Sequence, residues 1–590
     1  MNATRIKSKP IGPERLYVLL LVLGACAIGL IGKAFSMQVL HKSFYQDQGD
    51  ARFLRDMPVA ASRGPITDRR GEPLAISTPM VSLWAEPRLL LEARAQFTQL
   101  APLLGLSEAD LVERLESRRD KEFIYLRRLL PPEAAEQVLA LGLPGLNGQR
   151  EYRRFYPGGE VFAHVVGYTD VDDQGQEGLE LAFDSWLLGK PGVKRVIRNR
   201  RGETVENIEE LRAAEPGQEL RLTLDRRLQY LAHRELKAAI FENSAASGSM
   251  VILDVPTGEV LAMVNYPSYN PNARGNNDPA TRRNRAVTDV FEPGSVIKSF
   301  TVAAGLESGK FKPDTEINTH PGTLMVANHL VRDIRDFGVI NPTRVLTKSS
   351  NVGATRIAQA LDDEHLYDMY RRFGFGQSTG SGFPGESAGT LPEPNTWGAV
   401  EKATLSYGYG LSVTTLQLAQ SYAALANGGL RNSPTFILGA ETAERESQLL
   451  DPEITRSLVE MLETVTGPEG GAIKARVLNY RVAGKTGTAR RASAGGYENR
   501  HISVFAGMVP ASRPRLAAAI VIHDPQGGVY YGGLVAAPVF GRVMDDAMRL
   551  LNVAPDALQP ALLAQGVPST IPAWDTAQVD LDLAAEGVMP

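Results

Sequence analysis

Ser295 and Lys298 are the first residues in the sequence whose types and spacing could support catalysis. They follow the turn-forming pair Pro293-Gly294, and on a helix beginning at Ser295 the lysine lies one turn away on the same face. A serine hydroxyl needs a nearby base to act as a nucleophile. A lysine can be that base when burial or a second cation disfavours its charged form, and the apolar residues around the pair predict such burial. The N-terminus of the helix also favours negative charge developing at Ser295.

Ser349 and Asn351 form a second candidate element, which lies in a polar turn. The Ser349 hydroxyl could pass a proton between Lys298 and a leaving amine, and Asn351 offers a donor and an acceptor for a substrate amide. Serine-rich turns with asparagine are common, so this element is weak alone. Ser268 and Asn270 match the same S-x-N spacing, but they precede the nucleophile in a proline-containing loop, and we exclude them.

The third element, Lys485-Thr486-Gly487-Thr488, lies on a candidate strand. Gly487 has no Cβ, so a substrate backbone could approach the strand there. Thr486 and Thr488 could bind a terminal carboxylate, with the positive charge of Lys485 nearby. Pairing of an extended substrate with an edge strand is a common mode of recognition.

The three elements occur in the order S-x-x-K, S-x-N and K-T-G between Ser295 and Gly487. Each is weak alone, but this ordered set is the signature of penicillin-binding proteins and serine β-lactamases, which the sequence resembles. A competing motif, Gly376-Gln377-Ser378-Thr379-Gly380, matches the G-x-S-x-G nucleophile elbow of α/β-hydrolases. That elbow needs a strand before it and a helix after it. A helical pattern precedes this segment and more glycines follow, which predicts a loop.

The helices and strands expected around these motifs occur in the order hairpin, helices and three strands. This order predicts an α+β domain, with an antiparallel sheet covered by helices. Asp225 is placed to cap a helix that carries leucines on one face. A helix is also expected over 295–307. Strands are expected in a hairpin over 250–264 and then near 481–489, 501–508 and 515–523.

Composition excludes several other classes of function. At 590 residues the chain is too long for one hydrophobic core. The net charge of −4 gives no indication of a nucleic-acid partner. The single cysteine, Cys26, excludes an intramolecular disulfide framework. The eight histidines are scattered without a metal-binding pattern, so we expect neither a metal site nor a cofactor.

Near the N-terminus, residues 16–32 carry no charge and are apolar enough for a membrane anchor that extends to about residue 40. The basic residues before this segment predict a cytoplasmic N-terminus and a translocated remainder. Two alternatives remain open. Leu23-Gly24-Ala25-Cys26 resembles a lipobox, although the apolar run continues beyond Cys26. A cleaved signal peptide also fits the basic start, but no convincing A-x-A cleavage site follows.

Further motifs make the chain resemble the class B penicillin-binding proteins, from the anchor to about residue 550. Arg63-Gly64-x-Ile66-x-Asp68-Arg69, Arg154-Phe155-Tyr156-Pro157 and Gly178-Leu179-Glu180 are similar to the three motifs of the N-terminal module of that class. The stretch from Tyr407 to Thr414 is similar to one in the septal, or cell-division, branch. The resemblance implies a D,D-transpeptidase that cross-links peptidoglycan stem peptides through a serine acyl-enzyme, in the septal branch or in a close paralogue.

The resemblance also implies roles for individual residues. Ser295 would be the acylated nucleophile and Lys298 its base, while Ser349 and Asn351 would complete the proton relay and hold the substrate. Lys485, Thr486 and Thr488 would bind the carboxylate of a donor peptide or a β-lactam. Backbone N–H groups of Ser295 and Thr488 would form the oxyanion hole. The residues expected to line the cleft are Tyr409, Arg490 and Tyr531.

The expected organisation is a pedestal module followed by a penicillin-binding-protein-like or β-lactamase-like transpeptidase domain. The segments are a cytoplasmic N-terminus (1–15), a transmembrane anchor (16–40), a pedestal or dimerisation-type module (41–217), a transpeptidase domain (218–551) and an acidic tail expected to be disordered (552–590). We expect the pedestal module to serve partners rather than acylation. The expected location is the bacterial inner membrane, with a periplasmic catalytic domain. The expected protein partners are a polytopic membrane glycosyltransferase and other cell-division proteins.

Three alternatives share these motifs. A β-lactamase or penicillin sensor needs rapid deacylation or a signalling segment, and the large N-terminal module argues against both. A D,D-carboxypeptidase would use water rather than an amine as the acceptor, a difference the sequence does not resolve. A catalytically idle scaffold is disfavoured because Ser295, Lys298, Ser349 and Lys485 are all present.

Overall fold

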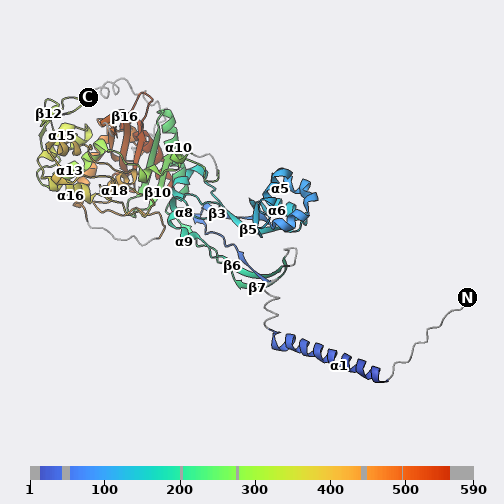
Figure 1. The fold of residues 1–590 in the computed structure, drawn as a ribbon. Coiled ribbons are helices and arrows are strands. Elements are labelled where there is room, and N and C mark those ends of the chain that lie inside the picture. Colours follow the sequence, from blue (N-terminus) through green and yellow to red (C-terminus); the bar gives the residue numbers. More distant parts are fainter. Residues whose placement is uncertain are drawn as a thin grey trace. The chain divides into compact units, whose positions relative to one another are not determined.

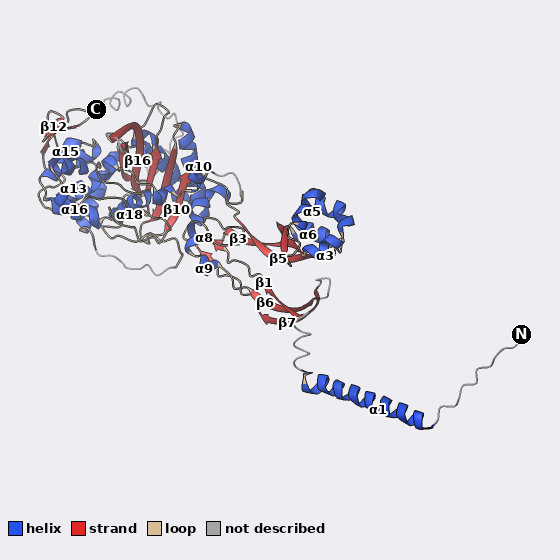
Figure 2. Ribbon diagram, viewed as in Figure 1, coloured by secondary structure: helices blue, strands red, loops and turns tan. Residues whose placement is uncertain are grey.

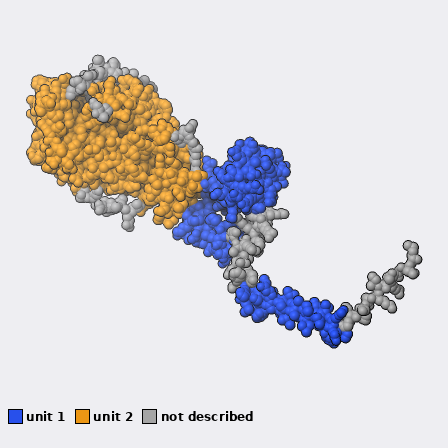
Figure 3. Space-filling model, in the orientation of Figure 1, with its two compact units in different colours: residues 1–62, 79–153, 189–216 blue, residues 63–78, 154–188, 217–590 orange. Residues whose placement is uncertain are grey.

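The computed structural model describes residues 13–42, 54–198, 204–273, 278–439, 448–493 and 496–557 (Figure 1). Contacts group the chain into two compact units, shown in separate colours in Figure 3. Unit 1 comprises residues 1–62, 79–153 and 189–216, and unit 2 comprises residues 63–78, 154–188 and 217–590. The segment 41–217 therefore contributes to both units.

The apolar segment near the N-terminus forms helix α1 (Pro13–Phe35), which continues into the π-helical turn η1 (Ser36–Leu40). Among the described residues, this is the one helix long and apolar enough to cross a membrane. None of its side chains is buried, and Cys26 lies exposed within it. The basic residues before position 13 lie outside the described part of the chain.

Unit 1 contains a three-stranded antiparallel sheet and a separate helical lobe. The sheet has the order β1 (Leu54–Val59), β6 (Gly192–Arg198) and β7 (Thr204–Arg212). The lobe has its own core, which consists mostly of buried leucines. Several short helices surround it, and the strand β4 interrupts them. Its elements are the outer part of β3 (Pro73–Ala85), β4 (Ile124–Leu130), most of β5 (Leu146–Phe155), α3 (Pro87–Glu92), η2 (Arg94–Gln96), α4 (Phe97–Leu104), α5 (Glu108–Glu116) and α6 (Pro132–Leu139).

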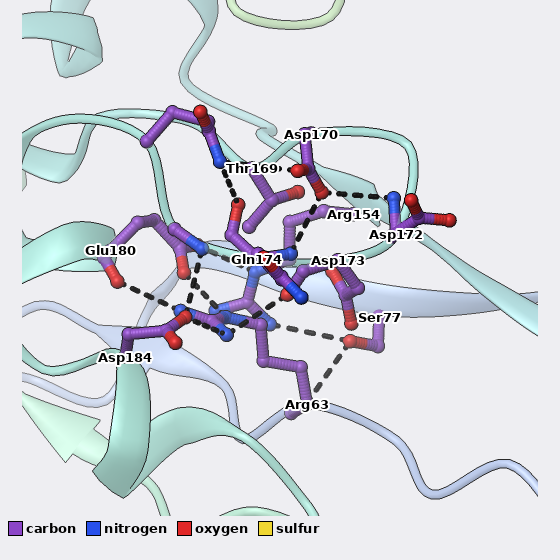
Figure 4. Close-up of polar contacts among 12 residues, drawn as sticks. Arg63, Ser77, Arg154, Thr169, Asp170, Asp172, Asp173, Gln174, Glu180 and Asp184 are labelled. Atoms are coloured by element: carbon purple, nitrogen blue, oxygen red, sulfur yellow. Dashed lines mark hydrogen bonds and ion pairs between the residues drawn. The ribbon is translucent and has the colours of Figure 1, made fainter.

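Two segments of unit 2, residues 63–78 and 154–188, meet at a buried charged cluster (Figure 4). Arg63 Nε donates to Glu180 Oε2 and Arg154 Nε to Glu180 Oε1, both at 2.6 Å, and all three side chains are fully buried. Arg63 also pairs with Asp184 at 2.8 Å. Arg63 and Arg154 of the N-terminal motifs face the interior, where they hold separate chain segments together. We call this set of four residues the junction cluster.

The short elements around the junction cluster complete this part of unit 2. They are β2 (Ile66–Thr67), β8 (Leu220–Arg221), η3 (Gly159–Val161), α7 (Ala163–Val166), α8 (Gly178–Ala182) and α9 (Asp184–Leu187). The strand pair β2–β8 is parallel, and β2 also pairs with the start of β3.

The rest of unit 2 is built on a five-stranded antiparallel sheet in the order β10-β9-β17-β16-β15. The strands are β9 (Ser247–Asp254), β10 (Val260–Tyr266), β15 (Ala483–Ser493), β16 (Gly496–Val509) and β17 (Leu516–His523). Every residue of β9 is buried, because helices cover both faces of the sheet (Figure 2). This confirms the expected hairpin, the three later strands and the α+β class.

Two helices pack on one another and against the sheet, and other helices also contact the sheet or surround the catalytic motifs. The first two are α10 (Arg226–Glu242) and α21 (Ala537–Leu550). Asp225 caps α10 by accepting a hydrogen bond from the N–H of Arg227, as predicted. The other helices are α11 (Pro279–Arg282), α12 (Arg285–Thr288), η4 (Gly294–Ile297), α13 (Lys298–Glu307), α14 (Pro342–Thr347), α15 (Asn351–Gln359), α16 (Asp363–Arg372), η5 (Pro394–Thr396), α17 (Ala399–Leu405), α18 (Thr415–Ala426), α19 (Pro452–Thr466), η6 (Ile473–Ala475) and α20 (Gly532–Val535).

Two small antiparallel strand pairs lie outside the main sheet. They are β11 (Ile317–Asn318) with β14 (Val339–Ile340), and β12 (Thr323–Val326) with β13 (His329–Arg332). After α21, Asp556 accepts hydrogen bonds from the N–H groups of Arg481 and Ser512. Residues 558–590, the greater part of the predicted tail, lie outside the described residues.

Candidate active site

Ser295 lies in the 3₁₀ turn η4, which leads directly into α13. The helical segment therefore matches the predicted range, with its first turn tighter than an α-helix. Gly294 has φ +57°, a left-handed conformation that favours glycine. A Cβ there would also come within 3.1 Å of the carbonyl oxygen of Thr488. Gly294 thus lets the nucleophile turn lie directly against β15.

Lys298 is fully buried, as the apolar residues around it predicted. Its Nζ donates to Asn351 Oδ1 at 2.6 Å, to Ser349 Oγ at 3.3 Å and to the carbonyl oxygen of Ser349. These acceptors come from the turn before α15 and from its first residue. The structure therefore brings the first two motifs together.

The Ser349 hydroxyl lies between two lysines. It accepts from Lys298 Nζ at 3.3 Å and from Lys485 Nζ at 3.1 Å. Ser349 also has φ +57°, which is uncommon for a residue with a Cβ. A hydroxyl has two acceptor lone pairs and one proton to donate. With both lone pairs engaged by lysines, the hydroxyl proton remains to be donated to a third group, which suits a proton relay.

A carboxylate that the sequence reasoning missed, Asp333, holds the start of α15. It accepts from the Ser350 hydroxyl at 2.6 Å and from the N–H groups of Asn351 and Val352 at 2.5 and 3.0 Å. Burial raises the pKa of Asp333. Nothing in the sequence marked this residue, because it lies well before the S-x-N motif, just after β13.

The side chain of Asn351 is oriented by a hydrogen bond to strand β13. Its Nδ2 donates to the carbonyl oxygen of Arg332, the last residue of β13, at 2.9 Å. The amide oxygen is therefore turned toward Lys298.

The K-T-G element lies on β15, the edge strand of the sheet, as the pairing argument required. Lys485 is buried on this strand. The Thr488 hydroxyl accepts from the N–H of Gly532 at 3.0 Å, which leaves its proton to donate. A Cβ on Gly487 would lie 2.5 Å from the carbonyl oxygen of Pro293. This glycine thus has a structural reason that we did not predict, the close approach of the nucleophile turn.

The three predicted cleft residues lie among other aromatic side chains. The ring of Tyr409 lies 5.6 Å from that of Tyr497 on β16, measured between centroids. Arg490 on β15 is opposite His501 on β16, and His501 stacks on Tyr530 at 3.9 Å.

Tyr531 is the third of these cleft residues. Its ring lies 4.5 Å from that of Tyr530. Arg490 and Tyr531 are therefore connected through His501 and Tyr530. Burial, and then the charge of Arg490, lowers the pKa of His501.

Glu292, the carboxylate nearest to Ser295 in sequence, has a structural role. Its Oε1 accepts from the N–H of Gly410 at 2.8 Å and from the hydroxyl of Tyr497 at 3.1 Å. Burial raises its pKa. These contacts connect the segment before the nucleophile to Gly410, the neighbour of Tyr409, and to Tyr497, whose ring contacts that of Tyr409.

The competing G-x-S-x-G motif is a loop, which confirms the prediction. It follows the end of α16 at Arg372 and precedes η5, and Ser378 is exposed. No strand leads into it in this described stretch, so the geometry of a nucleophile elbow is absent there.

Comparisons with known proteins match both parts of the chain. The family model for the penicillin binding protein transpeptidase domain matches residues 248–545, and that for the penicillin-binding protein dimerisation domain matches residues 58–222. The probable peptidoglycan D,D-transpeptidase PbpC of Pseudomonas aeruginosa is 42% identical, over 92% of this chain and 96% of that protein. The peptidoglycan D,D-transpeptidase FtsI of Escherichia coli is also 42% identical, over 90% of each chain.

A similar solved structure covers most of the chain. It is the crystal structure of penicillin-binding protein 3 from Mycobacterium tuberculosis, complexed with aztreonam. The sequence identity is 30%, the TM-score is 0.64, and the match covers 86% of this chain and all of that one.

Proposed function

The chain belongs to the penicillin-binding protein transpeptidases, and we propose that Ser295 is the nucleophile with which it cross-links peptidoglycan stem peptides. It is a serine-type D,D-transpeptidase, acylated by β-lactams as its family is. The assignment of the site rests on one observation: the Ser349 hydroxyl accepts hydrogen bonds from both Lys298 and Lys485. That contact joins the three sequence motifs in one buried network.

Acylation begins when the Ser295 hydroxyl attacks the carbonyl carbon of the penultimate D-alanine. Lys298, as the free amine, takes the hydroxyl proton. The backbone N–H groups of Ser295 and Thr488 stabilise the oxyanion. The amide C–N bond then breaks, and the leaving amine of the terminal D-alanine receives a proton through Ser349. Lys485 and the hydroxyls of Thr486 and Thr488 bind the terminal carboxylate.

Cross-linking completes the cycle when the amine of an acceptor stem peptide attacks the ester on Ser295. The amine loses a proton to the same relay, the ester C–O bond breaks, and Ser295 regains its proton. Asn351 positions the substrate amide. The predicted cleft residues Tyr409, Arg490 and Tyr531 contact the peptides as they bind.

A labelled penicillin tests the assignment of the nucleophile. Mass spectrometry of the treated protein should show one adduct, on the peptide that contains Ser295, and Ser295→Ala should abolish it. An adduct on Ser378 would overturn the assignment. A D-alanine exchange assay with an amine acceptor separates transpeptidation from carboxypeptidation, because only the former yields the amide product.

Membrane anchoring through α1 fits the same function. We propose that the N-terminus is cytoplasmic and that the chain after the anchor is periplasmic, because basic residues precede α1 in the sequence. Residues 41–217 form the pedestal module and residues 218–551 the transpeptidase domain. The septal role, a polytopic glycosyltransferase as partner and contacts with other division proteins are part of this proposal.

A further inference from the structure

A groove in unit 2 follows the exposed face of α10 and contains none of the catalytic residues (α10 is labelled in Figure 1). Arg226, Tyr230 and Arg234 recur at four-residue intervals, so they lie on one face of this helix. The turn between β2 and β3, the region of η3 and the last turn of α21 complete the walls. The groove encloses about 840 Å³, within the range of about 300–1,000 Å³ that is usual for ligand sites.

The groove combines an apolar floor with a basic rim. Val161, Phe162, Leu231 and Leu550 are among the apolar residues that line it. Tyr230 lies beside them with 60% of its surface exposed, which is high for an aromatic residue next to other apolar groups. Five arginines and three carboxylates also line the groove. Two of these arginines, Arg227 and Arg549, also pair with carboxylates outside it, Asp225 and Asp545.

Only two of the three carboxylates face solvent. Asp68 is buried and accepts from the backbone N–H groups of Arg70, Glu72 and Arg226. The others form exposed pairs, Glu72 with Arg226 at 3.3 Å and Asp546 with Arg549 at 2.6 Å and Arg234 at 3.7 Å. Exposed pairs contribute about 0–1 kcal/mol, so carboxylates of a ligand can replace them at little cost.

We propose that the acidic C-terminal segment of this chain, around Val579-Asp580-Leu581-Asp582-Leu583, binds in the groove. The segment alternates apolar and acidic residues, and no lysine or arginine follows Arg549 in the sequence. An extended chain places alternate side chains on opposite sides. Val579, Leu581 and Leu583 then contact the apolar floor, and the two aspartates face the arginine rim.

Covalent attachment favours the chain's own tail over a peptide of another protein. Leu550, at the end of α21, is itself a groove residue, and the described chain ends at Ala557. From Ala557 to Val579 an extended chain spans up to roughly 70 Å at ~3.3 Å per residue. A tethered segment has an effective concentration in the millimolar range, so weak contacts suffice to fill the site.

Disulfide trapping in the full-length protein tests this docking. In a Cys26→Ser background, Tyr230→Cys is combined with Leu581→Cys. The matched control combines Phe241→Cys with Leu581→Cys, because Phe241 lies on the same helix, is 63% exposed and does not line the groove. We expect the intramolecular disulfide to form about tenfold faster in the first pair, with the difference reduced at high salt. Equal rates, or disulfides only between two chains, would overturn the proposal.

Charge reversal tests the recognition itself. Arg226→Glu with Arg234→Glu should slow trapping to the rate of the control pair, and Asp580→Arg with Asp582→Arg should restore it. Arg513→Glu, an exposed arginine outside the groove, should have no effect. Penicillin labelling reports that each variant is folded. Should the helix variants not fold, Asp580→Asn with Asp582→Asn must still slow trapping, and an unchanged rate there would overturn the proposal.

Discussion

Unit 2 contains two buried clusters of charged residues that use their cations in different ways. In the catalytic cluster, Lys298 and Lys485 donate to the hydroxyl of Ser349, and Lys298 also donates to amide oxygens. In the junction cluster, Arg63 and Arg154 donate directly to the two oxygens of one carboxylate, Glu180 (Figure 4). The first cluster joins cations to neutral acceptors and the second joins cations to an anion.

The difference explains why one cluster can transfer protons and the other cannot. An arginine stays protonated in proteins, and a carboxylate partner stabilises its charge further. A lysine that donates to neutral oxygens can lose a proton without leaving an unpaired buried carboxylate. Asp333, the carboxylate beside the catalytic cluster, uses its oxygens on the Ser350 hydroxyl and on the backbone N–H groups of Asn351 and Val352.

The sharpest test of this contrast is the removal of Lys298. Lys298→Ala should slow acylation by penicillin by about 10²–10⁴-fold, because the nucleophile loses its base. The thermal midpoint should change far less than the rate, since no buried carboxylate loses a hydrogen-bond partner. Stopped-flow acylation and thermal unfolding measure the two effects. Lys310→Ala, an exposed lysine on the same domain, is the control. A normal acylation rate in Lys298→Ala would assign the base elsewhere.

Arg154→Ala should show the opposite pattern. It leaves one oxygen of the buried Glu180 without its cation, which typically costs about 3–5 kcal/mol. Acylation of the protein that remains folded should stay near normal, because the junction cluster contains no catalytic group. Urea unfolding measures the loss, and Arg344→Ala, which breaks an exposed pair, should cost less than about 1 kcal/mol. Equal losses in the two variants would contradict a structural role for the junction cluster.

How far the sequence predicted these clusters depends on the range of the contacts. The three catalytic motifs were predictable, because residue type, order and local spacing identify them. The apolar residues next to Lys298 in the sequence predicted its burial, and Asp225 was predicted to cap α10. The structure shows both. Asp333 and the packing reason for Gly487 were not predictable, since both depend on contacts between distant segments.

The N-terminal motifs illustrate the same limit. Arg63, Arg154 and Glu180 are charged residues scattered over more than a hundred positions, and such residues are usually exposed. Only the folded structure brings them to one interior point, so their pairing was not predictable from the sequence.

Removing the Asp333 carboxylate should have a smaller effect on acylation and stability. This carboxylate supports the catalytic cluster but takes no part in the proton transfers of the reaction. Asp333→Ala leaves two backbone N–H groups and a hydroxyl without their acceptor, which should cost about 2–3 kcal/mol. Acylation should slow as well, because Asn351 is no longer held. The control, Asp336→Ala, removes an exposed aspartate that pairs with His320. Unchanged stability and acylation in Asp333→Ala would show that α15 keeps its position without this carboxylate.

The smallest predicted effect concerns Asp173, whose carbonyl oxygen accepts from Arg63 in the junction cluster. Burial raises the pKa of Asp173 from 3.8 to about 6. The folded protein therefore binds this proton more tightly than the unfolded chain. The associated stability is fully present below about pH 4 and is lost as the pH rises to about 6. The shift corresponds to about 3 kcal/mol at most, and partial exposure reduces it to about 1–2 kcal/mol.

Asp173→Asn should remove this pH dependence, and asparagine tolerates the φ of +62° at this position. The free energy of unfolding of the variant, relative to the wild type, should therefore rise between pH 4 and pH 6 and stay constant above. Urea unfolding at several pH values measures this difference. The same measurement on Asp172→Asn, the exposed neighbour, should give a flat difference. If the difference in the free energy of unfolding between Asp173→Asn and the wild type did not change with pH, the pKa of Asp173 would not be raised. The arginines of the junction cluster would then compensate for the burial of Asp173, as they do for Glu180.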